Sequence, residues 1–311
     1  MTKIIFMGTP DFSVPVLKNL HEKYPVALVI SQPDRPVGRK RVLTSPPVAQ
    51  VAKELEIPVY QPENVSKEGI EKIKEINPDL IITAAYGQLL SEELLNIPKQ
   101  GAINVHASLL PKHRGGAPIH RSIIEGDKET GISIMYMEKS LDSGDIISQK
   151  AIPILDEDNV GTLHDKLSTL GSRLLLETLP SILDGTNKRR RQDHNAATFS
   201  PNISKKDEYV SFDREVREVF NHIRGLNPWP GGYTTVEGER LKLYESKLTN
   251  EATTEQPGKI IEITTDGFLV ATKDELLEIT EVQPAGRTRI LATDYINNNP
   301  GLVGVVLGEK S

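Results

Sequence analysis

The chain has 311 residues, a length that favours two domains over one. Hydrophobic residues make up 37% of it and charged residues 26%, which is ordinary for a globular protein. It contains no cysteine, which excludes disulfides, a thiolate nucleophile and any cysteine-ligated metal site. The formal net charge of −6 argues against a uniformly basic nucleic-acid binder, although local basic patches can still contact phosphate.

The first residues predict a strand and not a targeting segment. The apolar run over residues 3–7 is far too short for a signal peptide or a membrane span. Together with the lack of cysteine, it indicates a cytoplasmic protein without a membrane partner.

The opening of the chain predicts a Rossmann-like, mostly parallel sheet. The strand over residues 3–7 is followed by a helical pattern, for which Ser13 is the expected N-cap, and by a second strand over 26–30. A strand–helix–strand unit of this kind is typical of a parallel α/β sheet. Only one glycine, Gly8, lies in the first turn, so the G-x-G-x-x-G signature of a nicotinamide cofactor is missing.

Residues 32–41 form a long predicted loop that is rich in proline and glycine. Loops of this length inside a compact domain are usually functional or disordered. The loop carries four cations, which are Arg35, Arg39, Lys40 and Arg41. These cations can bind a phosphate backbone. The alternative is a solvated, flexible loop, and the composition of the loop does not distinguish between the two possibilities.

A strongly apolar strand pattern over residues 79–85 ends in a short polar segment. Helical patterns over 47–56 and 69–76 precede this strand. We expect Tyr86 and Gly87, directly after it, to wall the same crevice as the end of the next strand.

The stretch from Gly101 to Asp145 organises the chain. Asn104 and His106 are two positions apart, so in an extended strand they project to the same face. A polar pair at the carboxyl end of a strand, followed by a loop rich in proline and glycine, is where open α/β sheets place ligands. Asp142 lies in a second glycine-containing loop. The alternative is a structural Asn, a solvated His and a turn Asp, but together these residues favour one site.

The second half of the chain predicts a linker and a second domain. Four consecutive cations begin a polar run after a long helical pattern over residues 162–183: Lys188, Arg189, Arg190 and Arg191. Such a run is usually solvated, but it also suits phosphate contacts. We expect a first domain at 1–187, a linker at 188–206 and a second domain at 207–311.

The second domain is predicted to be a small, OB-like antiparallel β-barrel. A helical pattern over residues 215–224 is followed by several short strand patterns separated by turn residues. From residue 205 to the end, 13 Lys and Arg residues stand against 18 Asp and Glu residues. Any RNA contact in this domain is therefore expected to use a limited face.

Several motifs resemble the folate-dependent formyltransferase signature: Asn104-x-His106, Ser108-Leu109-Leu110-Pro111, Arg114-Gly115-Gly116-Ala117-Pro118 and Leu141-Asp142-Ser143-Gly144-Asp145. These motifs mark the wider superfamily. The basic loop over 32–41 and the predicted C-terminal barrel narrow the resemblance to the methionyl-tRNA formyltransferase family. The similarity extends through further segments: 7–12, 32–36, 226–231 and 283–287.

The resemblance implies 10-formyltetrahydrofolate as donor, the α-amino group of methionyl initiator tRNA as acceptor, and a monomer. Asn104, His106 and Asp142 match the catalytic residues of the family. The expected folate-binding residues are Ser108, Leu109, Leu110, Pro111, Tyr86 and Gly87. The expected tRNA-binding residues are Arg35, Arg39, Lys40, Arg41, Lys188, Arg189, Arg190 and Arg191. No metal is expected, because no cysteine or acidic residue near His113 or His120 shows a ligand spacing.

The chemistry of these residue types agrees with the implied reaction. Attack of an amine on a formyl carbon creates an oxyanion, to which an Asn104 amide N–H and a protonated His106 can donate. Asp142 is expected to orient His106 and a water molecule. Three alternatives remain at this point. They are formyl transfer to a small amine, hydrolysis of formyltetrahydrofolate, and a non-catalytic RNA-binding module.

Overall fold

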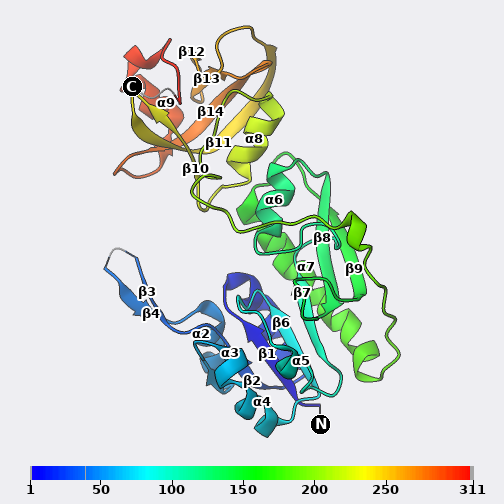
Figure 1. Cartoon of the computed structure of the whole chain (residues 1–311). Helices are drawn as coiled ribbons and strands as arrows, with labels where there is room; N and C mark the ends of the chain where they lie inside the picture. Colours follow the sequence, from blue (N-terminus) through cyan, green and yellow to red (C-terminus); the bar gives the residue numbers. More distant parts are fainter. Residues whose placement is uncertain (1, 39, 309–311) are drawn as a thin grey trace. The chain divides into compact units, whose positions relative to one another are not determined.

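The computed structural model describes residues 2–38 and 40–308 and divides the chain into two compact units. The first unit comprises Met1–Pro118, Thr130–Ile152 and His164–Pro201, and the remaining segments form the second. Figure 1 shows the elements of both units in chain order. Arg39, one of the expected tRNA-binding residues, lies outside the described residues.

Strands and helices are interspersed in the first two thirds of the chain. The strands are β1 (Ile4–Gly8), β2 (Val26–Ile30), β3 (Arg35–Val37), β4 (Val42–Thr44), β5 (Val59–Tyr60), β6 (Leu80–Ala84), β7 (Ala102–His106), β8 (Glu129–Tyr136) and β9 (Ile146–Pro153). The helices are α1 (Val14–Lys23), α2 (Pro47–Glu54), α3 (Val65–Glu68), α4 (Ile70–Ile76), α5 (Glu92–Leu95), α6 (Pro118–Ile124) and α7 (Val160–Leu183), with the 3-10 helices η1 (Asp11–Ser13) and η2 (His194–Ala196).

Seven strands form the central sheet of the first unit, in the order β5-β2-β1-β6-β7-β8-β9. Strand β1 pairs in parallel with β2 and β6, and β6 pairs in parallel with β7. The pair of β7 and β8 is antiparallel. The prediction of a Rossmann-like, mostly parallel sheet is confirmed.

Strand β7 has one face that packs against α7 and one face that carries the polar pair. A Cβ atom on Gly171 of α7 would lie only 2.9 Å from Cγ1 of Val105, so helix and strand are in close contact there. Successive side chains of a strand point to opposite faces. Asn104 and His106 therefore share the face of β7 that is turned away from α7.

The prediction that the Ser13 side chain caps α1 is wrong. Its side chain makes no cap hydrogen bond, and its hydroxyl donates to the main-chain oxygen of Ala84 at 2.5 Å. Ser13 is fully buried against the end of β6, where this oxygen is the acceptor within its reach. The serine thus joins η1 to β6, a partner that local spacing could not reveal.

The predicted basic loop contains regular structure. Strands β3 and β4 pair as an antiparallel hairpin, with Arg35 opposite Thr44 and Val37 opposite Val42. Figure 1 shows this hairpin projecting from the rest of the first unit. A two-stranded sheet holds its side chains in a defined register, which a flexible loop would not do.

The second unit contains an antiparallel sheet covered by a helix. Its elements are α8 (Val216–Arg224), β10 (Gly232–Val236), β11 (Glu239–Ala252), β12 (Ile260–Ile263), β13 (Phe268–Ala271), β14 (Glu275–Pro284), β15 (Ile290–Leu291), α9 (Ala292–Asn297) and η3 (Pro300–Leu302). Strands β10, β11, β14, β13 and β12 follow one another in the sheet, and β15 pairs with β14. The prediction of antiparallel strands is confirmed, and closure into an OB-like barrel stays a prediction.

Helix α8 has an amphipathic sequence that explains its place on this sheet. Val216, Val219, Phe220 and Ile223 recur at helical spacing and belong to one buried cluster with side chains of β11 and β14. Arg224, at the end of the helix, is buried and donates from Nη1 to the main-chain oxygen of Leu155 at 2.6 Å. This bond helps to explain why Pro153–Leu163 belongs to the second unit.

His222 of α8 is held as a neutral imidazole. Its Nδ1 lies 2.5 Å from Nη2 of Arg214, and a guanidinium can only donate, so Nδ1 accepts. Its Nε2 lies 2.6 Å from the main-chain oxygen of Asp207, to which it donates. Burial lowers the pKa of His222, the hydrogen bond to Asp207 opposes this, and the charge of Arg214 adds to the lowering.

We predict that His222 makes the fold less stable in acid. A histidine whose folded pKa is lowered contributes stability that is complete above its unfolded pKa, about 6.5, and is lost as the pH falls below that value. His222→Gln keeps one donor and one acceptor but does not titrate. Thermal unfolding between pH 7.5 and 5 should therefore depend less on pH in this variant. An unchanged pH dependence would contradict the prediction.

Candidate functional site

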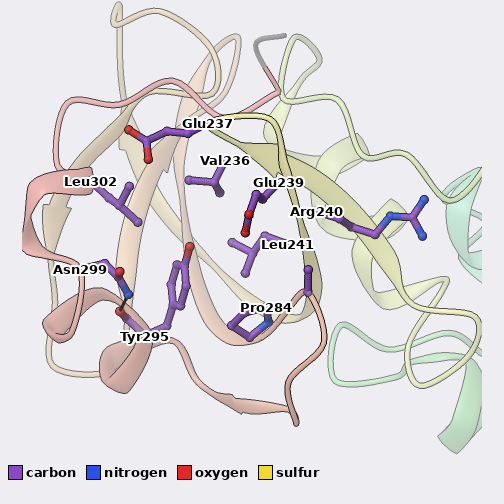
Figure 2. A pocket seen from close by; sticks show the side chains of 10 residues that line it. Val236, Glu237, Glu239, Arg240, Leu241, Pro284, Tyr295, Asn299 and Leu302 are labelled. Carbon is purple, nitrogen blue, oxygen red and sulfur yellow. Dashed lines mark hydrogen bonds between the residues drawn. The ribbon is translucent and has the colours of Figure 1, made fainter. Parts of the chain in front are cut away.

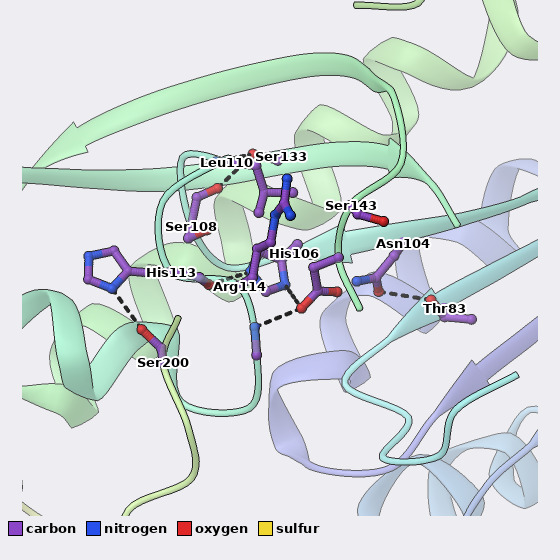
Figure 3. A network of polar contacts seen from close by, with 12 residues as sticks. Thr83, Asn104, His106, Ser108, Leu110, His113, Arg114, Ser133, Ser143 and Ser200 are labelled. Atoms are coloured by element: carbon purple, nitrogen blue, oxygen red, sulfur yellow. Dashed lines mark hydrogen bonds and ion pairs between the residues drawn. The ribbon is translucent and has the colours of Figure 1, made fainter. Parts of the chain in front are cut away.

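Asn104 is oriented by a hydrogen bond from the neighbouring strand. Thr83 of β6 lies opposite Asn104 in the sheet, and its hydroxyl donates to Oδ1 of Asn104 at 2.8 Å. Because Oδ1 is the acceptor, the amide nitrogen is directed the other way. Figure 3 shows this nitrogen on the side of Asn104 that faces His106. The amide nitrogen of Asn104 is thus directed away from Thr83, on the side where His106 lies.

His106 is buried at the end of β7, where a main-chain oxygen is hydrogen-bonded to one ring nitrogen and a carboxylate lies near the other. Its Nε2 lies 2.9 Å from the main-chain oxygen of His113, and because a carbonyl only accepts, Nε2 carries the hydrogen. Its Nδ1 lies 3.8 Å from Oδ2 of Asp142. The Nδ1 edge of the ring is therefore the edge turned toward the carboxylate.

Asp142 reaches His106 from the loop between β8 and β9. Its Oδ2 accepts a hydrogen bond from the main-chain nitrogen of Gly115 at 2.8 Å. Its φ angle is +48°, in the left-handed region that side-chain-bearing residues adopt only at a cost. The structure thus brings together His106 and Asp142, with Asn104 beside His106 on the same strand face.

The predicted folate-binding segment, residues 108–111, is held by hydrogen bonds within its loop and to side chains of β8 and β9. The hydroxyl of Ser108 donates to the main-chain oxygen of Lys112 at 2.7 Å. The main-chain nitrogen of Leu110 donates to the Ser133 hydroxyl at 3.1 Å, and Gln149 donates to the Leu110 oxygen at 2.9 Å. Ser108 and Leu110 are buried, whereas Leu109 and Pro111 are half-buried.

Tyr86 and Gly87 lie at the carboxyl ends of β1, β2 and β6, but the Tyr86 ring points into the core. Tyr86 belongs to the same buried cluster as Ile5 and Leu28, and burial raises the pKa of its phenol above the usual range. The main-chain oxygen of Tyr86 accepts from the Thr9 hydroxyl at 2.8 Å. Any contact of Tyr86 with a ligand at this end of the sheet would therefore use its main chain.

The hairpin cations differ in their partners. Arg35 forms an exposed ion pair with Glu63, with Nη2 and Oε2 2.6 Å apart. Lys40 and Arg41, in the turn between β3 and β4, are exposed. Three apolar side chains on the same hairpin are also exposed: Val37, Val42 and Leu43. The hairpin therefore presents both cations and apolar groups to solvent.

The basic run after α7 is packed along the first unit. Nε of Arg189 lies 3.0 Å from Oδ2 of Asp145, and the guanidinium stacks 4.2 Å above the centre of the Tyr136 ring. The main chain of Arg190 pairs with Ile146 of β9. Lys188 and Arg191 are exposed. Arg189 and Arg190, two of the four residues predicted to contact phosphate, thus also hold this segment against the first unit.

No group of three or more potential metal ligands occurs among residues 2–38 and 40–308. None of the helices in the described part of the chain combines the length and apolar character needed to cross a membrane.

A cavity of about 280 Å³ in the second unit lies among residues 236–302. Figure 2 shows Glu237, Glu239 and Tyr295 around it, whereas Arg240 points away from the other lining side chains. Burial and the charges of the two glutamates raise the pKa of the Tyr295 phenol. None of the residues that line this cavity belongs to the predicted formyl-transfer site.

Comparisons with known proteins show the family of this chain. Residues 2–179 match the family model for formyl transferase, and residues 202–300 match the model for the formyl transferase C-terminal domain. The chain is 55% identical over 312 residues to methionyl-tRNA formyltransferase of Staphylococcus aureus strain bovine RF122 / ET3-1, which covers 100% of this chain and 99% of the relative. The protein of strain JH1 has the same identity and coverage.

Two solved structures share the fold at low sequence identity. An N-formyltransferase from Helicobacter canadensis, in complex with folinic acid and dTDP-3-aminofucose, has a TM-score of 0.68 and 19% identity over 90% of this chain and 99% of its own. HypX from Aquifex aeolicus, in complex with tetrahydrofolic acid, has a TM-score of 0.64 and 15% identity over 95% of this chain and 47% of its own. By its matches to the two family models and its 55% identity to full-length relatives, the chain belongs to the methionyl-tRNA formyltransferase family of formyl-transferring enzymes.

Proposed function

We propose that this chain transfers the formyl group of 10-formyltetrahydrofolate to the α-amino group of methionyl initiator tRNA. The observation that carries the proposal is the approach of Asp142 to His106 at the end of β7, beside the oriented amide of Asn104. The full-length similarity to a methionyl-tRNA formyltransferase supports the acceptor. The folate compounds bound to the two structural relatives support the donor.

The first step is attack of the neutral amine nitrogen on the formyl carbon. A carbon–nitrogen bond forms, and the electrons of the carbonyl double bond move to its oxygen. We assign the stabilisation of this oxyanion to an N–H of Asn104 and to Nδ1–H of protonated His106. Each such donor is worth about 3 kcal/mol in comparable sites. The Nε2 hydrogen is unsuited to this role because it is donated to His113.

In the second step the bond between the formyl carbon and N10 of the folate breaks. The attacking nitrogen loses a proton and N10 gains one, so the charges and protons of the overall transfer balance. Asp142 orients His106 and the water molecule through which this proton leaves. The Gly115 N–H holds one oxygen of the carboxylate, which fixes its direction during the transfer.

The folate is proposed to bind across the ends of β6 and β7. Of the segment Ser108, Leu109, Leu110 and Pro111, the half-buried Leu109 and Pro111 have side chains able to contact the ligand. The main chain of Tyr86 and Gly87 would form the opposite wall. Ser108 and Leu110 hold this segment in shape through their internal contacts.

The tRNA is proposed to contact both basic elements of the first unit. On the hairpin these are Arg35, Lys40 and Arg41, with Arg39 assigned by sequence alone. After α7 they are Lys188, Arg189, Arg190 and Arg191. We further propose a catalytic domain at 1–187, a basic linker at 188–206 and a tRNA-binding barrel at 207–311. The protein would act as a monomer in the cytoplasm.

We predict formyl transfer to methionyl initiator tRNA and little transfer to methionyl elongator tRNA. The assay follows labelled formyl from 10-formyltetrahydrofolate into tRNA, free formate and a small acceptor such as a nucleotide-linked amino sugar. Label only on the amino sugar would establish a small-amine transferase. Release of formate without transfer would establish a hydrolase, and no reaction with RNA binding alone would leave a binding module.

We predict that Arg41→Ala weakens the use of tRNA and leaves folate binding intact. Loss of one phosphate contact should raise the KM for tRNA and reduce the slope of its salt dependence by about 1. Arg173→Ala provides the control, because Arg173 is an exposed arginine on α7. Equal loss of tRNA use and folate binding in Arg41→Ala would refute this division of roles.

A further inference from the structure

Gln192 lies in the segment predicted to be a linker, yet only 6% of it is exposed. Its amide nitrogen donates to the main-chain oxygens of Asp142 at 2.9 Å and of Gly144 at 2.7 Å. Its amide oxygen accepts from Nε of Arg114 at 3.1 Å and from Nη2 at 2.7 Å. Because carbonyls only accept and a guanidinium only donates, these four bonds fix one orientation of the amide.

The Asp142 loop is a part of the chain that benefits from such a restraint. Asp142 has a left-handed φ of +48°, a conformation that residues with side chains adopt less readily than glycine. Gly144 passes so close to β8 that a Cβ on it would lie 1.9 Å from the main-chain oxygen of Tyr136. A small shift of the loop would move the Asp142 carboxylate relative to His106.

Arg114 and Gly115 are neighbours that act on the Asp142 loop in two ways, through Gln192 and through the Asp142 carboxylate. The main-chain nitrogen of Gly115 holds the carboxylate of Asp142, and the guanidinium of Arg114 holds Gln192, which holds the main chain of Asp142. Arg114 is itself only 5% exposed. Side chain and main chain of Asp142 are therefore fixed by two neighbouring residues of the loop after β7.

The residues before Gln192 attach the same segment to the far side of the loop. We call residues 189–192 the strap. Arg189 pairs with Asp145 at 3.0 Å. The main-chain nitrogens of Arg190 and Ile146 each donate to the other residue's oxygen, at 2.9 and 2.8 Å. The strap thus runs along the loop from Asp142 to Ile146.

We infer that Gln192 is a positioning residue for the proposed formyl transfer. It acts through Asp142, by holding the main chain of the loop so that the carboxylate stays at the Nδ1 edge of His106. The inference rests on the proposed function and adds to it a residue outside the family motifs found in the sequence. It also gives part of the predicted linker a place beside the catalytic site.

Two substitutions distinguish the bonds of Gln192 to the loop carbonyls from its bonds to Arg114. Gln192→Met keeps the length of the side chain and removes all four hydrogen bonds. Gln192→Glu keeps an acceptor for Arg114 but replaces the amide nitrogen with an oxygen that faces two carbonyls. Gln100→Met is the matched control, because it removes a 2.7 Å bond from Gln100 to the main-chain oxygen of Leu183.

The test measures kcat and KM of the full-length variants. We expect Gln192→Met and Gln192→Glu to lower kcat about tenfold to a hundredfold, because small misplacements of reacting groups cost this much. The KM for 10-formyltetrahydrofolate should change by less than about twofold, and Gln100→Met should retain kcat. In an Asp142→Ala background, Gln192→Met should cause no further loss.

The inference is overturned if Gln192→Met and Gln100→Met have the same kcat. It is also overturned if the losses of Gln192→Met and Asp142→Ala multiply, as they would for independent effects. Amide hydrogen exchange over residues 139–146 provides a readout without substrate, and Gln192→Met but not Gln100→Met should accelerate it. If the unaltered chain transfers no formyl group, the proposed function fails, and the exchange still decides whether Gln192 restrains the loop.

Discussion

The hydrogen bond from the Gly115 nitrogen to Oδ2 of Asp142 joins the two loops on which the site depends. Gly115 has a φ of +117°, and a Cβ on it would lie 2.8 Å from the main-chain oxygen of Ser200. Only glycine fits this position without displacing Ser200. The surrounding main chain is held in turn, because Arg114 donates to Thr198 at 2.9 Å and accepts from Ser200 at 2.7 Å. The carboxylate is thus placed by backbone contacts far from Asp142 in sequence.

Strand β7 links the packing of the first unit to its proposed chemistry. Its Val105 face is covered by α7, where Gly171 permits the close approach. The alternation of side chains then leaves Asn104 and His106 on the opposite face. Thr83 of the adjacent parallel strand lies in register with Asn104, and its hydroxyl orients the side-chain amide of Asn104. The same register that builds the sheet therefore also orients a proposed oxyanion donor.

The sequence predicted the candidate site best where local spacing determines which residues lie together. The period of a strand placed Asn104 and His106 on one face, and the loop motif drew attention to Asp142. It could not identify Gln192, whose acceptor on Asp142 lies 50 positions away, or the link from Gly115 to Asp142 across 27 positions. Both bonds depend on which loops the fold brings together. The composition of the segment around Gln192 favoured a solvated linker, because polarity alone does not distinguish exposed from internally satisfied groups.

Stabilisation of the formyl-transfer oxyanion by the face of β7 is the part of the proposed mechanism on which the other roles depend. The most direct measurement is the single-turnover rate of formyl transfer by Asn104→Ala, together with its affinity for 10-formyltetrahydrofolate. We expect a rate about a hundredfold lower at unchanged folate affinity, because the lost N–H acts on the transition state. A rate close to that of the unaltered chain, or a loss confined to folate affinity, would contradict it.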